Sequence, residues 1–435
     1  MTYTETLDFL YARLPMFHRI GPAAYKNSLE NTLLIDEYFG HPHRNFKTVH
    51  VGGTNGKGSV SHMLAAVMQN AGYKTGLYTS PHLVDFRERI RVNGEMISEQ
   101  EVTDWVEKHA VGQNLWNIEP SFFELTVALA FDYFSRQKVD IAIIEVGLGG
   151  RLDSTNIITP EVSVITNIGY DHVQLLGDTL EKIASEKAGI IKGGVPVVIG
   201  ETNPETEPVF RKTAQSLNSP LYFADQEFKA GYALLSLDGK QVLNILKHDS
   251  PAFPDLRIDL LGNYQQKNVP TVLKTIEIMQ EKGWKISTDN IYNGLKNAAS
   301  STGLMGRWQI IGNNPLIVCD TGHNEDGIKM IVNQIKNTAY QNLHIVFGMV
   351  ADKDIEHVLQ LLPREATCYF TRAALPRALD EKILAEQANL IGLKGESYPS
   401  VKEAFTTAKM NAGKNDFVFV GGSNFVVAEI LQQKK

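Results

Sequence analysis

Hydrophobic residues recur along the chain in short runs that alternate with amphipathic segments. The run VDIAIIEV at 139–146 is almost continuously apolar, which indicates a strand buried on both faces of a sheet. Residues 162–168 and 195–199 repeat this pattern. By contrast, Val60, Leu64 and Val67 recur at helical spacing. Buried strands that alternate with helices predict an α/β fold with a large, mostly parallel sheet.

The pattern changes at two places along the chain. Between residues 222 and 262 the runs shorten, and LDGK at 237–240 is typical of a hairpin turn, so we expect a β-rich addition here. The segment NAASSTG at 297–303 is short and polar, which is typical of a boundary between domains. We therefore predict a large domain at 1–298 and a smaller Rossmann-like domain at 303–435. Strands of the second domain are expected at 315–320, 343–348, 367–371 and 416–421.

Composition narrows the classes of partner. The chain has 435 residues and a formal net charge of −7, which argues against broad electrostatic binding of nucleic acid. A polyanionic ligand would need a local basic patch, and FRERIRV at 86–92 supplies either that or the solvated face of a strand. There are two cysteines, no signal-like N-terminus and no apolar run near the roughly 20 residues that cross a bilayer. We expect a cytoplasmic protein with neither nucleic acid nor membrane as partner.

The sequence HVGGTNGKGS at 50–59 lies between a strand-like run and a helix-like run. Such a glycine-rich turn directs backbone N–H groups and a helix N-terminus at one point, which suits a phosphate chain. Lys57 would then reach the outer phosphates, and the Ser59 hydroxyl would hold Mg²⁺. Gly58 separates these two residues, so the stretch departs from the usual phosphate-loop pattern of kinases and GTPases. An ordinary glycine-rich loop is the structural alternative.

Polar residues follow three of the expected strands. Glu145 ends the strand at 139–146, at the edge of an α/β sheet where Mg²⁺ ligands are placed. Ser80 follows a short strand, and Asp171 and His172 follow another. We interpret Ser80, Glu145 and His172 as metal ligands. A loop-capping acid and a structural histidine are the alternatives.

Other polar residues point to substrate contacts. Arg151 and Asp153 follow a glycine-rich stretch that lets a ligand approach the backbone. Lys187 cannot ligate a cation as an ammonium, so it is either a partner of phosphate or carboxylate, or a lysine that carries CO₂ as a carbamate. In the smaller domain, Asp320 suits a ribose hydroxyl or a cation, and Arg307 suits a nucleotide phosphate. Both can instead be structural.

Together these motifs resemble the folylpolyglutamate synthase and dihydrofolate synthase family of the Mur ligase superfamily. The similar segments are HVGGTNGKGS, YTSPHL, ERIRVNG, SFFE, EVGLGGRLDSTN, DHVQLLGDT, EKAGIIK, LLGNYQQKN, GRW, DTGHN, FGMVADKD and GGSNFVVAE. The resemblance accounts for the additional glycine of GTNGKGS. It implies a Mur-ligase-like fold and an ATP-dependent ligase that adds L-glutamate to dihydropteroate, to reduced folates, or to both, through an acyl phosphate. A bifunctional monomer is the expectation.

The resemblance also implies roles for individual residues. ATP contacts match Thr54, Asn55, Gly56, Lys57, Gly58, Ser59, Asn268, Arg307, Asp320 and His323. The resemblance implies two bound Mg²⁺ ions. The family's metal ligands match Ser59, Ser80, Glu145, His172 and a carbamylated Lys187. Ser121, Phe123, Glu124 and Asp153 lie in segments that match the lining of the family's pterin and substrate site, and Arg151 lies near Asp153 in the sequence. Lys57, His172 and Lys187 are the expected catalytic residues.

Three positions depart from the family pattern. Gly322 stands where alanine usually precedes the histidine, Ser121 where threonine is common, and Ser154 where many members have alanine. Ser121 keeps the hydroxyl of threonine, and Asp320, His323 and Asn324 around Gly322 are retained. Three other functions stay open: a cell-wall Mur-type amino-acid ligase, a phosphate-loop NTPase switch, and a folate-binding protein without catalysis. The intact set of Lys57 and the metal-site residues speaks against the last.

Overall fold

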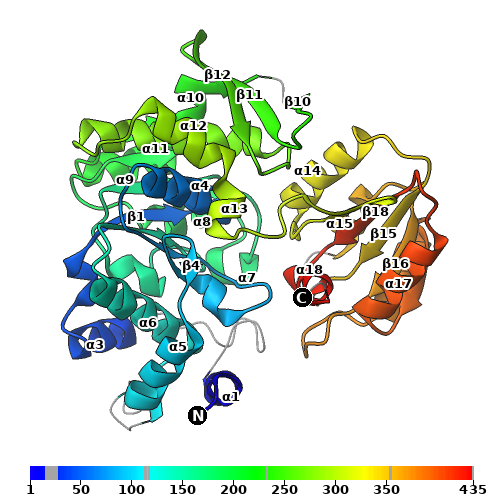
Figure 1. Cartoon of the computed structure of the whole chain (residues 1–435), viewed down its shortest axis with the longest axis horizontal. Coiled ribbons are helices and arrows are strands. Elements are labelled where there is room, and N and C mark those ends of the chain that lie inside the picture. The colour runs from blue at the N-terminus through cyan, green and yellow to red at the C-terminus, as the bar shows by residue number, and fades with distance from the viewer. Residues whose placement is uncertain (15–27, 112–114, 116–117, 232–233, 352–354, 434–435) are drawn as a thin grey trace. The chain divides into compact units, whose positions relative to one another are not determined.

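The computed structural model describes residues 1–14, 28–111, 115, 118–231, 234–351 and 355–433. The chain forms two compact units (Figure 1). Unit 1 comprises Met1–Asp259 and Gln265–Leu304, and unit 2 comprises Leu260–Tyr264 and Met305–Lys435. Each unit contains a sheet with helices, so the predicted α/β class is confirmed.

The sheet of unit 1 has eight strands in the order β4-β3-β2-β5-β1-β6-β7-β8. Six neighbouring strands, β2, β5, β1, β6, β7 and β8, run parallel. Strands β3 and β4 add an antiparallel edge beside β2. The predicted buried strands at 139–146, 162–168 and 195–199 are confirmed as β5, β6 and β7. The bounds are β1 Lys47–Gly52, β2 Thr75–Tyr78, β3 Ile90–Val92, β4 Glu95–Met96, β5 Ile141–Glu145, β6 Val162–Ile165, β7 Val197–Ile199 and β8 Leu221–Phe223.

Helices cover both faces of this sheet (Figure 1). Helix α4 is buried along most of its length and packs with α11, α12 and α13. On the other face, α6 shares a core with Ala142 and Ile144 of β5. The helices of unit 1 are α1 Tyr3–Arg13, α3 Glu30–Tyr38, η2 Pro42–Asn45, α4 Lys57–Asn70, η3 Phe86–Arg89, α5 Glu99–Val106, η4 Glu107–Val111, α6 Phe122–Gln137, η6 Ser154–Ile157, α7 Val173–Leu176, α8 Leu180–Ala188, α9 Glu207–Ser216, α10 Ala224–Glu227, α11 Gln265–Glu281, α12 Thr288–Lys296 and α13 Ala298–Thr302.

The expected β-rich addition is confirmed as a small antiparallel sheet in unit 1. It contains β9 Phe228–Ala230, β10 Leu234–Leu235, β11 Gln241–Lys247 and β12 Ser250–Ile258. The turn between β10 and β11 is closed by the Ser236 N–H, which donates to the Lys240 carbonyl at 2.8 Å.

The polar segment 297–303 is not an extended linker. It forms the helix α13, in which Ala298 and Thr302 are fully buried. The Thr302 hydroxyl lies 2.7 Å from His62 Nδ1 of α4. The small polar residues therefore serve close helix packing. The division between the two units follows directly after this helix, between Leu304 and Met305.

Unit 2 has a six-stranded sheet in the order β13-β14-β18-β15-β16-β17, with β13 antiparallel at one edge. The four predicted strands are confirmed as β14 Leu316–Cys319, β15 Leu343–Phe347, β16 Thr367–Thr371 and β18 Phe417–Gly421. Sequence reasoning missed the two edge strands, β13 Gln309–Asn313 and β17 Lys394–Tyr398, because half-exposed edges need no apolar run. The helices are α14 Glu325–Lys336, α15 Ile355–Leu361, α16 Glu381–Leu390, α17 Val401–Asn411 and α18 Asn424–Gln432.

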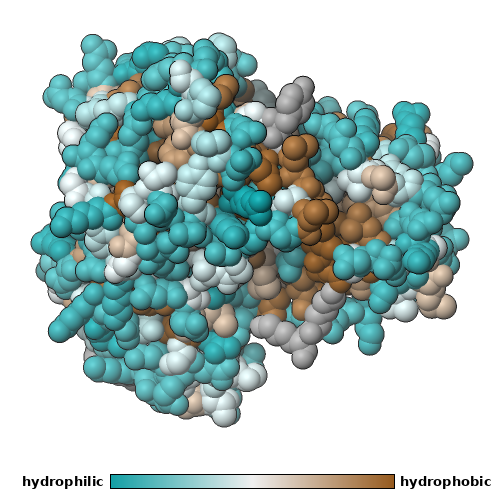
Figure 2. All heavy atoms as spheres, turned by 45° about the horizontal axis from the view of Figure 1, so that its top comes forward, coloured by the Kyte–Doolittle hydropathy of each residue, from teal (hydrophilic) through white to brown (hydrophobic). Residues whose placement is uncertain are grey.

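The surface gives no sign of a membrane-spanning helix. Among the described residues, every helix is too short or too polar to cross a bilayer. Figure 2 shows mainly hydrophilic side chains on the visible face, with hydrophobic ones gathered over part of unit 2.

His50 of β1 makes folding stability depend on pH. Its side chain is fully buried, and Nε2 lies 2.9 Å from Thr155 Oγ1. Burial, with a smaller effect of the Lys192 charge, lowers the pKa of His50 from 6.5 to about 3. Between these pH values the unfolded chain binds a proton that the folded chain does not. Stability should therefore fall on acidification, by up to about 1.4 kcal/mol per pH unit.

Urea unfolding at pH 7, 6 and 5 measures this effect. The variant His50→Gln has no titrating ring, so its free energy of unfolding should fall less steeply with acid than that of the wild type. Equal slopes in the two proteins would contradict the prediction.

Candidate active site

The glycine-rich loop joins β1 to α4, and residues at the end of β6 hold it in shape. The Asn55 N–H donates to Asn167 Oδ1 at 2.9 Å, and the Thr166 hydroxyl donates to the Asn55 carbonyl at 2.5 Å. Gly53 and Gly56 have φ values of 137° and 85°, which favour glycine. The loop is therefore fixed, and α4 begins directly at Lys57.

We expect Gly53→Ala to destabilise the protein more than a matched change at Gly72. Both residues have positive φ, which costs about 1–3 kcal/mol for alanine. At Gly53 a Cβ would also clash with the Thr166 side chain, whereas at Gly72 it would meet nothing within 4 Å. Thermal unfolding of the two variants measures the difference. Equal losses would mean that Thr166 does not constrain the loop.

Two lysines from distant parts of the sequence share one carbonyl of this loop. Lys57 Nζ donates to the Gly53 carbonyl at 3.1 Å and to the Thr54 carbonyl at 3.0 Å. Lys187 Nζ, from α8, donates to the same Gly53 carbonyl at 2.9 Å. Burial of Lys187 and the nearby charge of Lys57 lower the pKa of Lys187 from 10.5 to about 7. Near neutral pH, a large share of Lys187 is therefore the uncharged amine.

The ends of β2 and β5 bring two predicted metal ligands together. These strands are parallel neighbours, and the Ser80 N–H donates to Glu145 Oε2 at 3.2 Å. Glu145 also pairs in register with Val51, two residues before Gly53. The carboxylate is therefore placed beside the glycine-rich loop, as expected for an acid at this edge of the sheet.

His172 and Ser59 come from other elements of unit 1. His172 has a φ of 50° at the start of α7, and its N–H donates to Asp171 Oδ1 at 2.8 Å. Ser59 lies in the first turn of α4. No group of three His, Cys, Asp or Glu side chains in the described part of the chain could hold a metal ion. The hydroxyls and the Glu145 carboxylate are nevertheless hard oxygen donors of the kind that Mg²⁺ prefers.

Gln265 is a site residue that sequence reasoning missed. Its side chain is fully buried, and Nε2 donates to Ser59 Oγ at 3.1 Å. Asn268 Nδ2 donates to Gln265 Oε1 at 2.7 Å, and a Cβ on Gly56 would clash with Asn268 Oδ1. The first turn of α11 therefore closes over the glycine-rich loop. The segment LLGNYQQKN contained this residue, but no spacing distinguished it from its neighbours.

Several residues expected on the substrate side hold local backbone. The Glu124 carboxylate accepts the Ser121 N–H at 2.6 Å, and Ser121 Oγ accepts the Glu124 N–H at 3.2 Å, so the pair caps α6. Asp153 is buried and accepts the N–H groups of Leu148 and Thr155 at 2.8 and 3.0 Å. Burial raises the pKa of Asp153. Their contact with a substrate stays a prediction.

Phe123 and Arg151 differ from this group. The Phe123 ring lies against Gly147, where a Cβ would clash with it. Arg151 is largely exposed and forms an ion pair with Glu186 at 2.9 Å. Phe123 therefore lies against the glycine-rich stretch at 147–150, whereas the Arg151 guanidinium is held at Glu186 of α8; their contact with a substrate stays a prediction.

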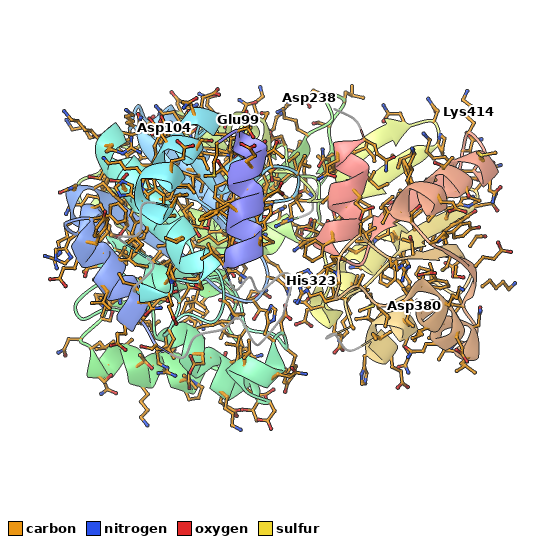
Figure 3. All side chains as sticks on the ribbon, turned by 90° about the horizontal axis from the view of Figure 1, so that it is seen from below. Glu99, Asp104, Asp238, His323, Asp380 and Lys414 are labelled. Atoms are coloured by element: carbon orange, nitrogen blue, oxygen red, sulfur yellow. The ribbon has the colours of Figure 1, made fainter. Side chains whose placement is uncertain are left out.

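Unit 2 holds the remaining predicted residues at the end of β14. Asp320 is buried, and its Oδ2 accepts the Tyr264 hydroxyl at 2.6 Å and the Trp308 N–H at 2.7 Å. Burial raises the pKa of Asp320. Arg307 donates to the Gly306 carbonyl and the Thr321 hydroxyl. His323, labelled in Figure 3, directs Nδ1 to the Thr321 carbonyl at 2.9 Å.

Comparison with known proteins assigns the chain to a family. The Mur ligase middle domain matches residues 51–275, and the Mur ligase glutamate ligase domain matches residues 306–424. The dihydrofolate synthase/folylpolyglutamate synthase of Bacillus subtilis is 33% identical, over 100% of this chain and 99% of that protein. The chain belongs to this family of Mur ligases. It is therefore an ATP-dependent ligase.

Solved structures of the family have the same fold. Escherichia coli FolC in complex with DHPP and ADP has a TM-score of 0.86 and 28% identity, and the alignment covers 100% of this chain and 98% of that one. A bifunctional folylpolyglutamate synthase/dihydrofolate synthase with Mn, AMPPNP and L-glutamate bound has a TM-score of 0.84 and 29% identity, with the same coverage. The expected Mur-ligase-like architecture is thus confirmed.

Proposed function

We propose that this ligase is bifunctional and adds L-glutamate both to 7,8-dihydropteroate and to reduced folates. The observation that carries the proposal is the arrangement at the C-terminal edge of the unit 1 sheet. There, Lys57 and Lys187 converge on the Gly53 carbonyl, and Glu145 lies in register beside the same loop. The names of the relatives support the same chemistry.

The proposed reaction has two steps. A carboxylate oxygen of the acceptor attacks the γ-phosphorus of ATP, the bond to the bridging oxygen breaks, and ADP leaves. The amine of L-glutamate then attacks the acyl carbon, loses a proton, and expels phosphate. Carboxylates are poor acylating agents, and phosphorylation supplies the leaving group. The Lys57 ammonium offsets the charge that spreads over the transferred phosphoryl group.

The side-chain donors of this site fit Mg²⁺, and we propose that two ions bind. Ser59, Ser80, Glu145 and His172 would hold the metal, which neutralises phosphate charge when bound. We propose that Lys187 joins them as a carbamate. Its neutral amine attacks CO₂, an N–C bond forms and a proton leaves, so the lysine gains anionic oxygens. The lowered pKa of Lys187 supports this because only the uncharged amine is nucleophilic.

The other proposed assignments follow the family. We propose that residues 1–298 form the ATP-binding domain with the folate site, and residues 303–435 the glutamate-ligase domain. We also propose a monomer and a cytoplasmic location, because two cysteines are too few for a disulfide framework in a chain of this length. Contacts to ATP are proposed for Thr54, Asn55, Gly56, Lys57, Gly58, Ser59, Asn268, Arg307, Asp320 and His323, and contacts to the acceptor for Ser121, Phe123, Glu124, Arg151 and Asp153.

Phosphate release from ATP with L-glutamate and one acceptor at a time tests the proposal. Release with both 7,8-dihydropteroate and a tetrahydrofolate, each with a product one glutamate heavier by mass spectrometry, is the expected result. Release with one acceptor would make the enzyme monofunctional. Release that ignores both acceptors would favour an NTPase switch, and glutamate incorporation into a nucleotide-linked cell-wall precursor would favour a Mur-type enzyme.

A further inference from the structure

Arg89 is a buried cation to which the folded chain supplies no carboxylate. It ends η3, and only 2% of its surface is exposed. Its Nε donates to His82 Nδ1 at 2.7 Å, and its guanidinium lies over the Phe122 ring, 5.3 Å from the centroid. Among the residues that the structure describes, Arg89 forms no ion pair with an acid.

The neighbouring Arg87 shows the contrast. Its guanidinium is partly exposed, and it donates to both carboxylate oxygens of Asp85 at 2.6–3.2 Å. The segment FRERIRV is therefore neither a free basic patch nor a solvated strand face. The three arginines have different environments: Arg87 pairs with a carboxylate, the buried Arg91 donates to the Gly94 carbonyl, and the buried Arg89 donates to a histidine.

A buried hydroxyl without a partner lies next to Arg89. Tyr78 ends β2 and is fully buried. Its hydroxyl faces the Arg89 guanidinium but makes no hydrogen bond of ordinary geometry with any described residue. In the sheet, Tyr78 pairs in register with Ile144, which precedes Glu145, and with Ile90, which follows Arg89. The Tyr78 hydroxyl and the Arg89 guanidinium thus lie together beside the predicted metal and substrate residues, and the one acceptor that the described side chains supply to them is His82 Nδ1, for the Arg89 Nε.

The aromatic surroundings indicate what reaches these donors. Tyr78 packs against Phe123, with ring centroids 6.2 Å apart, and Phe123 covers the backbone at Gly147. Phe122, under the Arg89 guanidinium, is its neighbour in sequence. A guanidinium kept from water is stable only when an anionic or strongly polar oxygen pairs with it. Aromatic rings around such a pair suit a flat, conjugated ligand.

We propose that Arg89 and Tyr78 bind an oxygen atom of the acceptor substrate. This rests on the proposed function and names two binding residues that the family motifs did not assign. The shared chemistry is a hydrogen-bond-accepting oxygen, and two sources supply it: an oxygen of the pteroyl portion, which every acceptor carries, or a carboxylate of the glutamyl tail, which dihydropteroate lacks. The planar guanidinium suits either source.

Steady-state kinetics with three variants tests this. Arg89→Gln should raise the KM for the acceptor about tenfold or more, and Tyr78→Phe should raise it severalfold, as expected for the loss of a charged and a neutral hydrogen bond. The KM for ATP should change by less than about twofold. The control Arg87→Gln removes an arginine that already has its carboxylate, so its acceptor KM should stay at the wild-type value.

The two acceptors distinguish the two sources of the oxygen. A rise in KM for both 7,8-dihydropteroate and tetrahydrofolate places the contact on the pteroyl portion, and a rise for tetrahydrofolate alone places it on the glutamyl tail. Calorimetric titration of each acceptor into the enzyme without ATP should show the same loss of affinity. If Arg89→Gln does not fold, Tyr78→Phe decides, because it removes one oxygen and keeps the ring.

Two results would overturn the inference. One is an unchanged acceptor KM in a folded Arg89→Gln or Tyr78→Phe enzyme. The other is an equal rise in the KM for ATP, because that would indicate a general loosening of the site. A wild-type enzyme that uses neither acceptor would instead contradict the proposed function.

Discussion

Lys57→Ala is expected to abolish turnover and leave the fold intact. The Lys57 ammonium lies at the start of α4 and bonds to the Gly53 and Thr54 carbonyls of the loop. Removing it leaves the charge of the transferred phosphoryl group without its protein partner. An arginine finger, a cation that stabilises the same transition-state charge, is worth about 10³–10⁵ in kcat, so a loss of about 10³-fold or more in phosphate release is expected.

The control for this prediction is Lys47→Ala. Lys47 starts the preceding strand, is 66% exposed and pairs with Glu161 at 2.9 Å, so its loss should leave kcat near the wild-type value. Circular dichroism and thermal unfolding of both variants report whether they fold. Near-normal turnover in a folded Lys57→Ala enzyme would contradict the prediction that residues 50–59 form the phosphate loop.

Lys187→Ala should lose activity, and small carboxylates such as acetate or formate should restore part of it. Lys187 is buried at the Gly53 carbonyl with a pKa lowered to about 7, so at neutral pH it presents the uncharged amine that the proposed carbamate requires. The alanine variant lacks the anionic oxygens that a carbamate would present. A small carboxylate that enters the vacated space would replace them. The dependence of kcat on acetate concentration in the variant measures this rescue.

Dependence on CO₂ provides a second measurement. The uncharged fraction of Lys187 grows as the pH rises through about 7, so reactivation of CO₂-depleted enzyme by bicarbonate should become more complete above this pH. Lys182→Ala is the matched control, because Lys182 lies on the same helix but is exposed and paired with Asp178. Full activity of Lys187→Ala without added carboxylate would contradict the proposal that Lys187 is carbamylated.

The predicted elements that the structure confirms share one property. Buried strands such as β5, and the turn at 237–240, are encoded by contiguous residues, because a strand covered on both faces must be apolar throughout. The edge strands β13 and β17 escaped prediction because one side of each meets solvent. Helix α13 escaped because small polar residues suit tight packing as well as they suit a loop.

The candidate site shows the same division. The glycine-rich loop and Glu145 were recognisable because their roles depend on position relative to one strand end. Gln265 was not recognisable, because its partner Ser59 is 206 residues away in the sequence. The same applies to residues 260–264, which pack with unit 2 although their neighbours on both sides belong to unit 1.

The sequence by itself determined the α/β class, the positions of most buried strands and the family, and it predicted a phosphate loop at residues 50–59. These depend on local pattern and on motifs of adjacent residues. Only the tertiary structure decided which polar groups are caps, as Ser121 and Glu124 are, and which ionisable groups are buried, as Lys187 and Arg89 are. The reason is physical: the loss of water around a charge, and the partner that compensates for it, depend on segments that meet only in the folded chain.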